Sequence, residues 1–168
     1  MLQNESVRPA RGTRSYPAAT PRQRNTELWP LPGICWNARV TTSFGELPVQ
    51  GLRVRDMVKT STGQFLPVKW VDQIHLDSDF LSGCPDARAI TIEPGTFGPG
   101  RPSQPLTISP QQRLNAAVGH GTYIRPARDL LDMPGASRST DTQQSYYLFH
   151  VGEPALIQVE GVLISTTP

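Results

Sequence analysis

The chain has 168 residues, 37% of them hydrophobic, with 17 prolines, 14 glycines and a net charge of +2. This length suits one domain plus a tail, and the proline and glycine content favours a turn-rich β domain over a helix bundle, because both residues break helices and form turns. The small net charge argues against a nucleic-acid partner, and two cysteines 49 positions apart make neither a disulfide framework nor a zinc site.

Residues 1–32 are predicted to be a disordered leader. They carry five arginines against two glutamates and few bulky apolar side chains, so they cannot bury enough surface to offset the entropy of ordering. A basic docking arm is the alternative for this segment. Its start contains no apolar run, which argues against an ordinary secretory signal, and no stretch of the chain reaches the roughly 20 apolar residues of a membrane span. We expect no membrane association and leave the compartment open, with the cytoplasm as the default.

From residue 33 onward, short apolar segments alternate with turn residues. Segments rich in β-branched and aromatic residues, bounded by glycine, proline and serine, predict strands. In the first half, strands are predicted at 40–42, 47–49, 54–60 and 65–71, with a continuation at 74–76 and turns at 43–46 and 61–63.

The second half follows the same pattern with longer loops. Loops are predicted at 77–87, 96–102 and 132–144, strands at 89–92, 106–108, 146–151, 156–159 and 162–164, and one short helix beginning near Pro126. No window sustains helical periodicity over ten or more residues. We therefore predict a single compact all-β domain over residues 33–168.

Two short motifs stand out within this domain. The first is Gly33-Ile34-Cys35-Trp36, a cysteine followed by an aromatic residue where the predicted domain begins, and the second is Leu106-Thr107-Ile108-Ser109-Pro110-Gln111-Gln112-Arg113. Together they resemble the first two motifs of the bacterial branch of the Hint (hedgehog/intein) domain family, whose second motif reads roughly L-x-x-S-P-Q-H-R. Gln112 stands where that motif has its histidine.

Further stretches resemble the same family in the same order. They are a hairpin over 45–58, an F-x-P-V-x-W strand over 65–71, a G-x-L-G-P-G loop over 95–100 and a closing hairpin over 159–162. Within the first hairpin, Arg55 stands where the family has glycine, and Asp56 is kept. The resemblance implies the compact, curled β fold of Hint domains, which agrees with the all-β prediction made from the strand pattern.

The resemblance also implies a self-cleaving activity. In the family the cysteine attacks the carbonyl of the preceding residue and converts an amide into a thioester, so Cys35 would be the nucleophile and Ile34 would supply the scissile carbonyl. Ser109 stands at the position of the family's Thr/Ser, which helps to hold the scissile peptide. Gln112 replaces the proton donor, and general acid–base help is worth about 10²–10⁴ in rate. We expect slow, single-turnover cleavage that releases residues 1–34 and uses neither a cofactor nor a metal.

A second departure concerns the closing strands, which in the family carry histidines in a pattern close to Y-x-H-L-x-x-D-R-H. The matching stretch begins at Tyr146 and places Leu148 and Pro154 at two of those positions. His120 and His150 are alternative proton donors, weighed against ordinary solvent-facing or hydrogen-bonded histidines.

Two hypotheses from different classes follow. One is an impaired self-cleaving Hint domain whose substrate is its own N-terminal segment. The other is a catalytically inactive Hint scaffold that serves as a binding or structural module, in which Cys35 is a small buried hydrophobe. The sequence leaves a Cys35–Cys84 disulfide open, and that bond would occupy the nucleophile. Splicing is not expected, because residues 164–168 contain no asparagine to cyclise.

Overall fold

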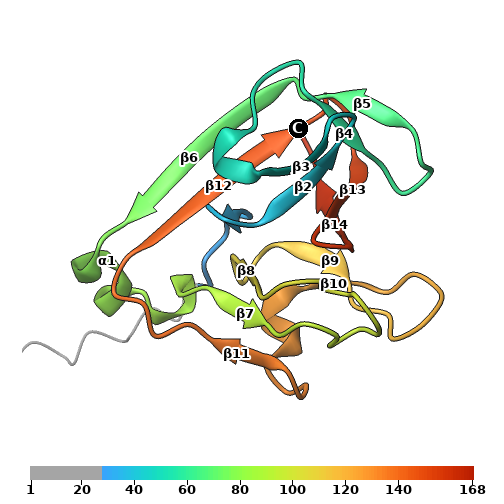
Figure 1. Ribbon diagram of the computed structural model, residues 1–168. Coiled ribbons are helices and arrows are strands. Elements are labelled where there is room, and N and C mark those ends of the chain that lie inside the picture. The colour runs from blue at the N-terminus through green and yellow to red at the C-terminus, as the bar shows by residue number, and fades with distance from the viewer. Residues whose placement is uncertain (1–27) are drawn as a thin grey trace, which may run out of the picture.

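The computed structural model describes residues 28–168, so most of the predicted leader, residues 1–27, lies outside the described residues. Short antiparallel strands dominate the described part (Figure 1), which confirms the all-β prediction. The strands are β1 (Ile34–Cys35), β2 (Arg39–Thr42), β3 (Gly45–Pro48), β4 (Met57–Lys59), β5 (Phe65–Pro67), β6 (Trp70–Leu76), β7 (Ile90–Ile92), β8 (Leu106–Ile108), β9 (Arg113–Asn115), β10 (Ile124–Pro126), β11 (Ala136–Arg138), β12 (Gln144–His150), β13 (Ala155–Val159) and β14 (Val162–Thr166). The helical elements are α1 (Ser78–Gly83) and the 3-10 turns η1 (Val49–Gly51), η2 (Pro85–Ala87) and η3 (Ala127–Leu130).

The strands form two sheets. One has the order β11-β7-β8-β1-β12-β6, and the other runs β10-β9-β14-β13-β2-β4-β5, with β3 paired to β2. Figure 1 shows β6 and β12 as a long pair along one side of the molecule, with β7 and β11 side by side at the far end of the same sheet. The two-residue strand β1 lies in the middle of this sheet, where Ile34 is opposite Ile108 on β8 and Tyr147 on β12.

Two apolar clusters form the interior. The larger contains Ile34 together with Val40, Ile108 and Leu114, each at most 1% exposed. The smaller contains Cys35 and collects Trp29, Leu76, Leu81, Ala87, Ala89 and Tyr146. Successive side chains of a strand point to opposite faces, so the two residues of β1 are buried in different clusters.

The structure departs from the predicted elements in several places. The predicted loop at 77–87 contains α1, because the carboxylate of Asp77 accepts a hydrogen bond from the Phe80 N–H (2.8 Å) and caps the helix. Short strands β9, β10 and β11 were not predicted, since each contains at most one bulky aliphatic or aromatic residue and shows no alternation. The helix expected near Pro126 is the 3-10 turn η3. Among residues 28–168, no helix has the length and apolar character required to cross a bilayer.

At Arg55 the chain keeps a turn although arginine stands where the family has glycine. Its φ of +82° lies in the left-handed region that non-glycine residues rarely adopt, at a conformational cost of about 1–3 kcal/mol. Two bonds hold the turn: the Arg55 N–H donates to the Val68 carbonyl (2.8 Å), and Asp56 accepts from the Arg53 N–H (2.8 Å).

Candidate functional site

Ser109 and the segment before β1 meet because β8 pairs with β1. Ser109 follows Ile108, the β8 residue opposite Ile34, and is fully buried. Its backbone N–H donates to the Gly33 carbonyl (2.9 Å), and its hydroxyl donates to the Leu31 carbonyl (2.6 Å). One serine therefore fixes two alternate carbonyls of the entering chain.

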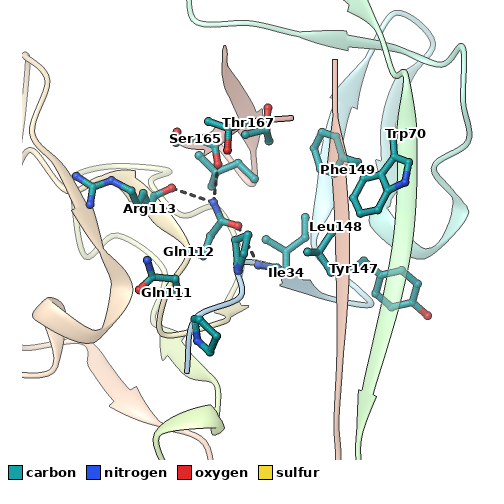
Figure 2. Close-up of a pocket in the computed structure, with 15 residues that line it drawn as sticks. Ile34, Trp70, Gln111, Gln112, Arg113, Tyr147, Leu148, Phe149, Ser165 and Thr167 are labelled. Carbon is teal, nitrogen blue, oxygen red and sulfur yellow. Dashed lines mark hydrogen bonds between the residues drawn. The ribbon is translucent and has the colours of Figure 1, made fainter. Parts of the chain in front are cut away.

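Gln112 binds the same segment from the other side of Gly33. Its side-chain oxygen accepts a hydrogen bond from the Gly33 N–H (3.1 Å), and its Nε2 donates to the carbonyls of Arg113 (3.0 Å) and Ser165 (2.8 Å). Figure 2 shows this amide between β9, β14 and the chain leading to Ile34. Both Nε2 protons are used by carbonyls, which leaves the oxygen free to accept from Gly33.

Gly33 has no room for a side chain. Its φ is +148°, and a Cβ atom built on it would lie 2.7 Å from the Cβ of Tyr146. Such a distance requires a strand of the sheet to shift. The residue that Ser109 and Gln112 bind through its backbone is therefore restricted to glycine, which offers no nucleophile.

Cys35 lies two residues further along, in different surroundings. It is 6% exposed, and its thiol donates to the side-chain oxygen of Gln144 (3.5 Å). Burial, with a smaller contribution from Asp141, raises the pKa of the Cys35 thiol to about 12. Since the thiolate is the nucleophilic form of cysteine, burial suppresses the reactivity of this residue. Cys84 is also a free thiol, so the disulfide that the sequence left open is not present in the structure.

The structure brings two of the predicted site residues onto one glycine, places Ile34 in the lining of one cavity with Gln112, and buries Cys35 in the smaller apolar cluster. Ser109 and Gln112 both bind Gly33, whereas no hydrogen bond within residues 28–168 joins either side chain to Cys35 or to Ile34. The catalytic roles predicted for these four residues stay predictions.

A cavity of about 280 Å³ lies beside Gln112. Figure 2 shows Trp70, Phe149 and Thr167 on its walls, and Pro32 and Gly33 also line it. Leu148, at a position where the family has histidine, lines this cavity. Pro154, at another such position, borders a separate hollow with Thr60 and Ser61.

The three histidines are engaged or exposed elsewhere. His150 stacks on Trp70, with ring centroids 5.4 Å apart, and its Nδ1 accepts from the Gly152 N–H (3.0 Å). His75 pairs with the Ser145 hydroxyl (2.9 Å), and His120 lies in an exposed loop. Within the described residues, no hydrogen bond joins any of them to Cys35 or Gln112. Over the same residues, no three His, Cys, Asp or Glu side chains gather where a metal ion would be held.

The sequence reasoning missed Trp29, which the boundary at residue 33 assigned to the leader. Its side chain is buried, and its backbone is bonded to Asp86 and Arg128. An isolated tryptophan in an otherwise polar, proline-rich stretch was the available signal, because a large aromatic side chain gains most from burial.

Comparisons with known proteins agree with this fold. A family model described as a Hint domain matches residues 32–167. The crystal structure of the MchDnaB-1 intein has a TM-score of 0.53 at 10% identity, covering 80% of this chain and 99% of that one. A DnaB intein from Synechocystis sp. PCC 6803 has a TM-score of 0.52 at 6% identity, covering 82% of this chain and 100% of that one. At such identities the likeness to solved structures establishes the fold alone, and no curated protein matches the chain.

Proposed function

This chain belongs to the Hint domain family, and we propose that it acts as a catalytically inactive member that binds a peptide segment without cleaving it. One observation carries the proposal. Ser109 and Gln112, at the family's Thr/Ser and histidine positions, both bind the backbone of Gly33. Glycine has no side chain to attack a carbonyl, so the peptide that these residues hold has no nucleophile of its own.

Cleavage between Ile34 and Cys35 needs an ionised thiol, a proton donor for the departing nitrogen, and hydrogen-bond donors that stabilise the oxyanion. A bond must form from the sulfur to the Ile34 carbonyl carbon, the bond from that carbon to the Cys35 nitrogen must break, and the departing nitrogen must gain a proton. Burial raises the pKa of the Cys35 thiol to about 12, so the thiolate that would attack is disfavoured at neutral pH.

The proton donor and the oxyanion donors are the other two requirements. Gln112 is a neutral amide that has no proton to transfer, and both of its Nε2 hydrogens are donated to carbonyls. The donors of Ser109 are directed at Leu31 and Gly33, upstream of the bond to be cut. Neither donor of Ser109 is directed at the Ile34 carbonyl, on which the oxyanion would form.

Intact mass spectrometry of the full chain over several days tests the proposal. Wild type, Cys35→Ala and Gln112→His are incubated with and without added thiol or hydroxylamine, which intercepts a thioester. We expect the full-length mass in every sample, because Gln112→His supplies a proton donor at Gly33 and not at Cys35. A product beginning at Cys35, present in wild type or Gln112→His and absent from Cys35→Ala, would contradict the proposal and support self-cleavage at Ile34–Cys35.

A further inference from the structure

The side chain of Trp29 fills a pocket built by distant parts of the chain. Its ring meets Phe80 of α1 edge-on, with centroids 5.6 Å apart, and lies tilted against Tyr146 of β12 at 6.4 Å. Tyr146 is fixed in turn, because its hydroxyl donates to the Ala87 carbonyl (2.6 Å). Within the described residues the indole Nε1 donates to no protein atom, although it is buried. The pocket therefore selects the size and flatness of the ring and not its N–H group.

The backbone of residue 29 is held on both sides by charged groups. Its N–H donates to the Asp86 carboxylate (2.6 Å), and its carbonyl accepts from the Arg128 guanidinium (2.8 Å). Asp86 and Arg128 also form an ion pair with each other (2.8 Å), with side chains 20% and 16% exposed. Arg138 adds a second cation 3.6 Å from Asp86, and Gln111 accepts from Arg128 (2.6 Å). Such a network fixes the two groups before a peptide reaches them, which lowers the ordering cost of binding.

The alternate residues downstream are bound in the same way. Ser109 holds the Leu31 carbonyl and the Gly33 carbonyl, and Gln112 holds the Gly33 N–H. Pro30 and Pro32 are exposed between these contacts. Proline has no N–H to leave unpaired and favours extended backbone, so both positions preset the bound shape at low entropic cost.

Each position of the segment thus has a definite requirement. Position 29 needs a large flat ring, and position 33 needs glycine because a Cβ would meet Tyr146 at 2.7 Å. Position 31 is open to other residues, since the side chain of Leu31 is 39% exposed and only its carbonyl is held.

We infer that the surface holding residues 29–33 is a recognition site for an extended Trp-Pro-X-Pro-Gly peptide, which this chain fills with its own segment. This inference deepens the proposed function, on which it rests, by naming the class of peptide bound. The site includes Ser109 and Gln112 and extends beyond them, because Asp86 and Arg128 hold the chain at Trp29, upstream of Gly33.

Peptide rescue of a full-length variant tests the inference. Trp29→Ala empties the aromatic pocket in the intact chain, and Trp36→Ala, which removes an indole that is 54% exposed, is the matched control. The probes are a blocked peptide of residues 28–33, the same peptide with alanine in place of its tryptophan, and N-acetyl-tryptophanamide, which carries an indole between two amides. Binding is followed by titration and by the midpoint of thermal unfolding.

We expect the tryptophan peptide to bind Trp29→Ala at least tenfold more tightly than the alanine peptide, and more tightly than N-acetyl-tryptophanamide. The substitution weakens the hold on the chain's own segment, and only the longer probe can displace that segment from the contacts of residues 31 and 33. The tryptophan peptide should also raise the unfolding midpoint of that variant. Wild type and Trp36→Ala should bind none of the three probes, because their own Trp29 occupies the pocket. Trp29→Leu, which keeps part of the apolar filling, serves as the receptor if the alanine variant does not fold.

Equal binding of the two peptides to the folded variant would overturn the inference. So would no binding to either folded variant, or binding of the longer peptide no tighter than that of N-acetyl-tryptophanamide. The outcome is independent of the mass experiment. Cleavage with intact peptide binding would refute the lack of catalysis and leave the recognition site standing. An uncleaved chain without peptide binding would refute the recognition site and leave the lack of catalysis standing.

Discussion

Gly33 and Cys35 are separated by a single residue, yet their surroundings are chemically opposite. Gly33 is enclosed by hydrogen-bonding groups, namely the backbone and hydroxyl of Ser109 nearby and the amide of Gln112. Cys35 is enclosed by aromatic and aliphatic side chains, with one amide oxygen within reach of its sulfur. The groups that hold the peptide backbone thus surround a residue without a nucleophilic side chain, while the predicted nucleophile, Cys35, lies where its charged form is disfavoured. A residue's place in a sequence motif and its place in a site are separate properties.

The largest effect in this comparison is expected from Gly33→Ala. The new methyl group would meet the Cβ of Tyr146 at 2.7 Å and would also need a φ of +148°, so we expect a loss of about 3 kcal/mol or more in the free energy of unfolding. Gly45→Ala is the matched control, since Gly45 also has a positive φ of +104° but open space around it, and should lose about 1–2 kcal/mol. Urea unfolding measures both, and equal losses would mean that Tyr146 does not restrict residue 33.

The next largest effect is expected from Gln112→Ala. The change leaves the Gly33 N–H and the carbonyls of Arg113 and Ser165 without their partner, at a cost of about 2–4 kcal/mol. Gln111→Ala, in the neighbouring and less buried glutamine, should cost about 1 kcal/mol. If the two variants unfold at the same urea concentration, Gln112 does not fix the segment before β1.

The surroundings of Cys35 should appear in the pH dependence of stability. Burial favours its neutral thiol, so the folded protein keeps this proton while the unfolded chain releases it near the ordinary pKa of 9.0. Stability should therefore fall as the pH rises from about 9 to 12, by up to about 1.4 kcal/mol per pH unit from this group. Tyr146, whose pKa is also raised by burial, acts in the same direction. Cys35→Ala should flatten the slope of a urea-unfolding series over this range, and an unchanged slope would argue against a suppressed thiolate.

The smallest effect is expected from Ser109→Ala. It removes the hydroxyl bond to the Leu31 carbonyl but keeps the backbone bond to the Gly33 carbonyl, so we expect a loss of about 1 kcal/mol. Ser137→Ala, at an exposed position of β11, should lose almost nothing. A loss as large as that of Gln112→Ala would mean that the hydroxyl, and not the amide, is the main hold on this segment.

Much of the fold was predictable because burial leaves a pattern in the sequence. The alternating apolar residues of β12, β13 and β14 and the turn residues between them identify these strands and the all-β class. The short helix α1 was missed because a single capping aspartate, Asp77, decides it within a polar stretch. Strand β11 forms by pairing with β7. Its three residues contain no pattern that predicts a partner 44 positions away in sequence, as in the register of Ala136 with Ile92.

The sequence indicated which residues belong to the candidate site. It did not indicate which backbone groups of the entering segment those residues bind. The motifs group Ser109 and Gln112 with Cys35, and in the structure both bind Gly33, two residues before it, while their predicted roles stay predictions. The backbone groups that they bind are set by the pairing of β1 with β8 and by the positive φ of Gly33. Neither feature can be predicted from the motif. The burial of the Cys35 thiol was equally hidden, because Leu81 and Tyr146 come from distant segments.

The central position of β1 also constrains the order in which this protein folds. The hydrogen bonds that hold residues 29–35 reach side chains between 57 and 109 positions later in the sequence. Contacts of such long separation form slowly, since the intervening loop must be closed before any bond forms. On the ribosome, the segment around Trp29 emerges long before Gln112 and Gln144. β1 can therefore take its place between β8 and β12 only after nearly the whole domain has been synthesised.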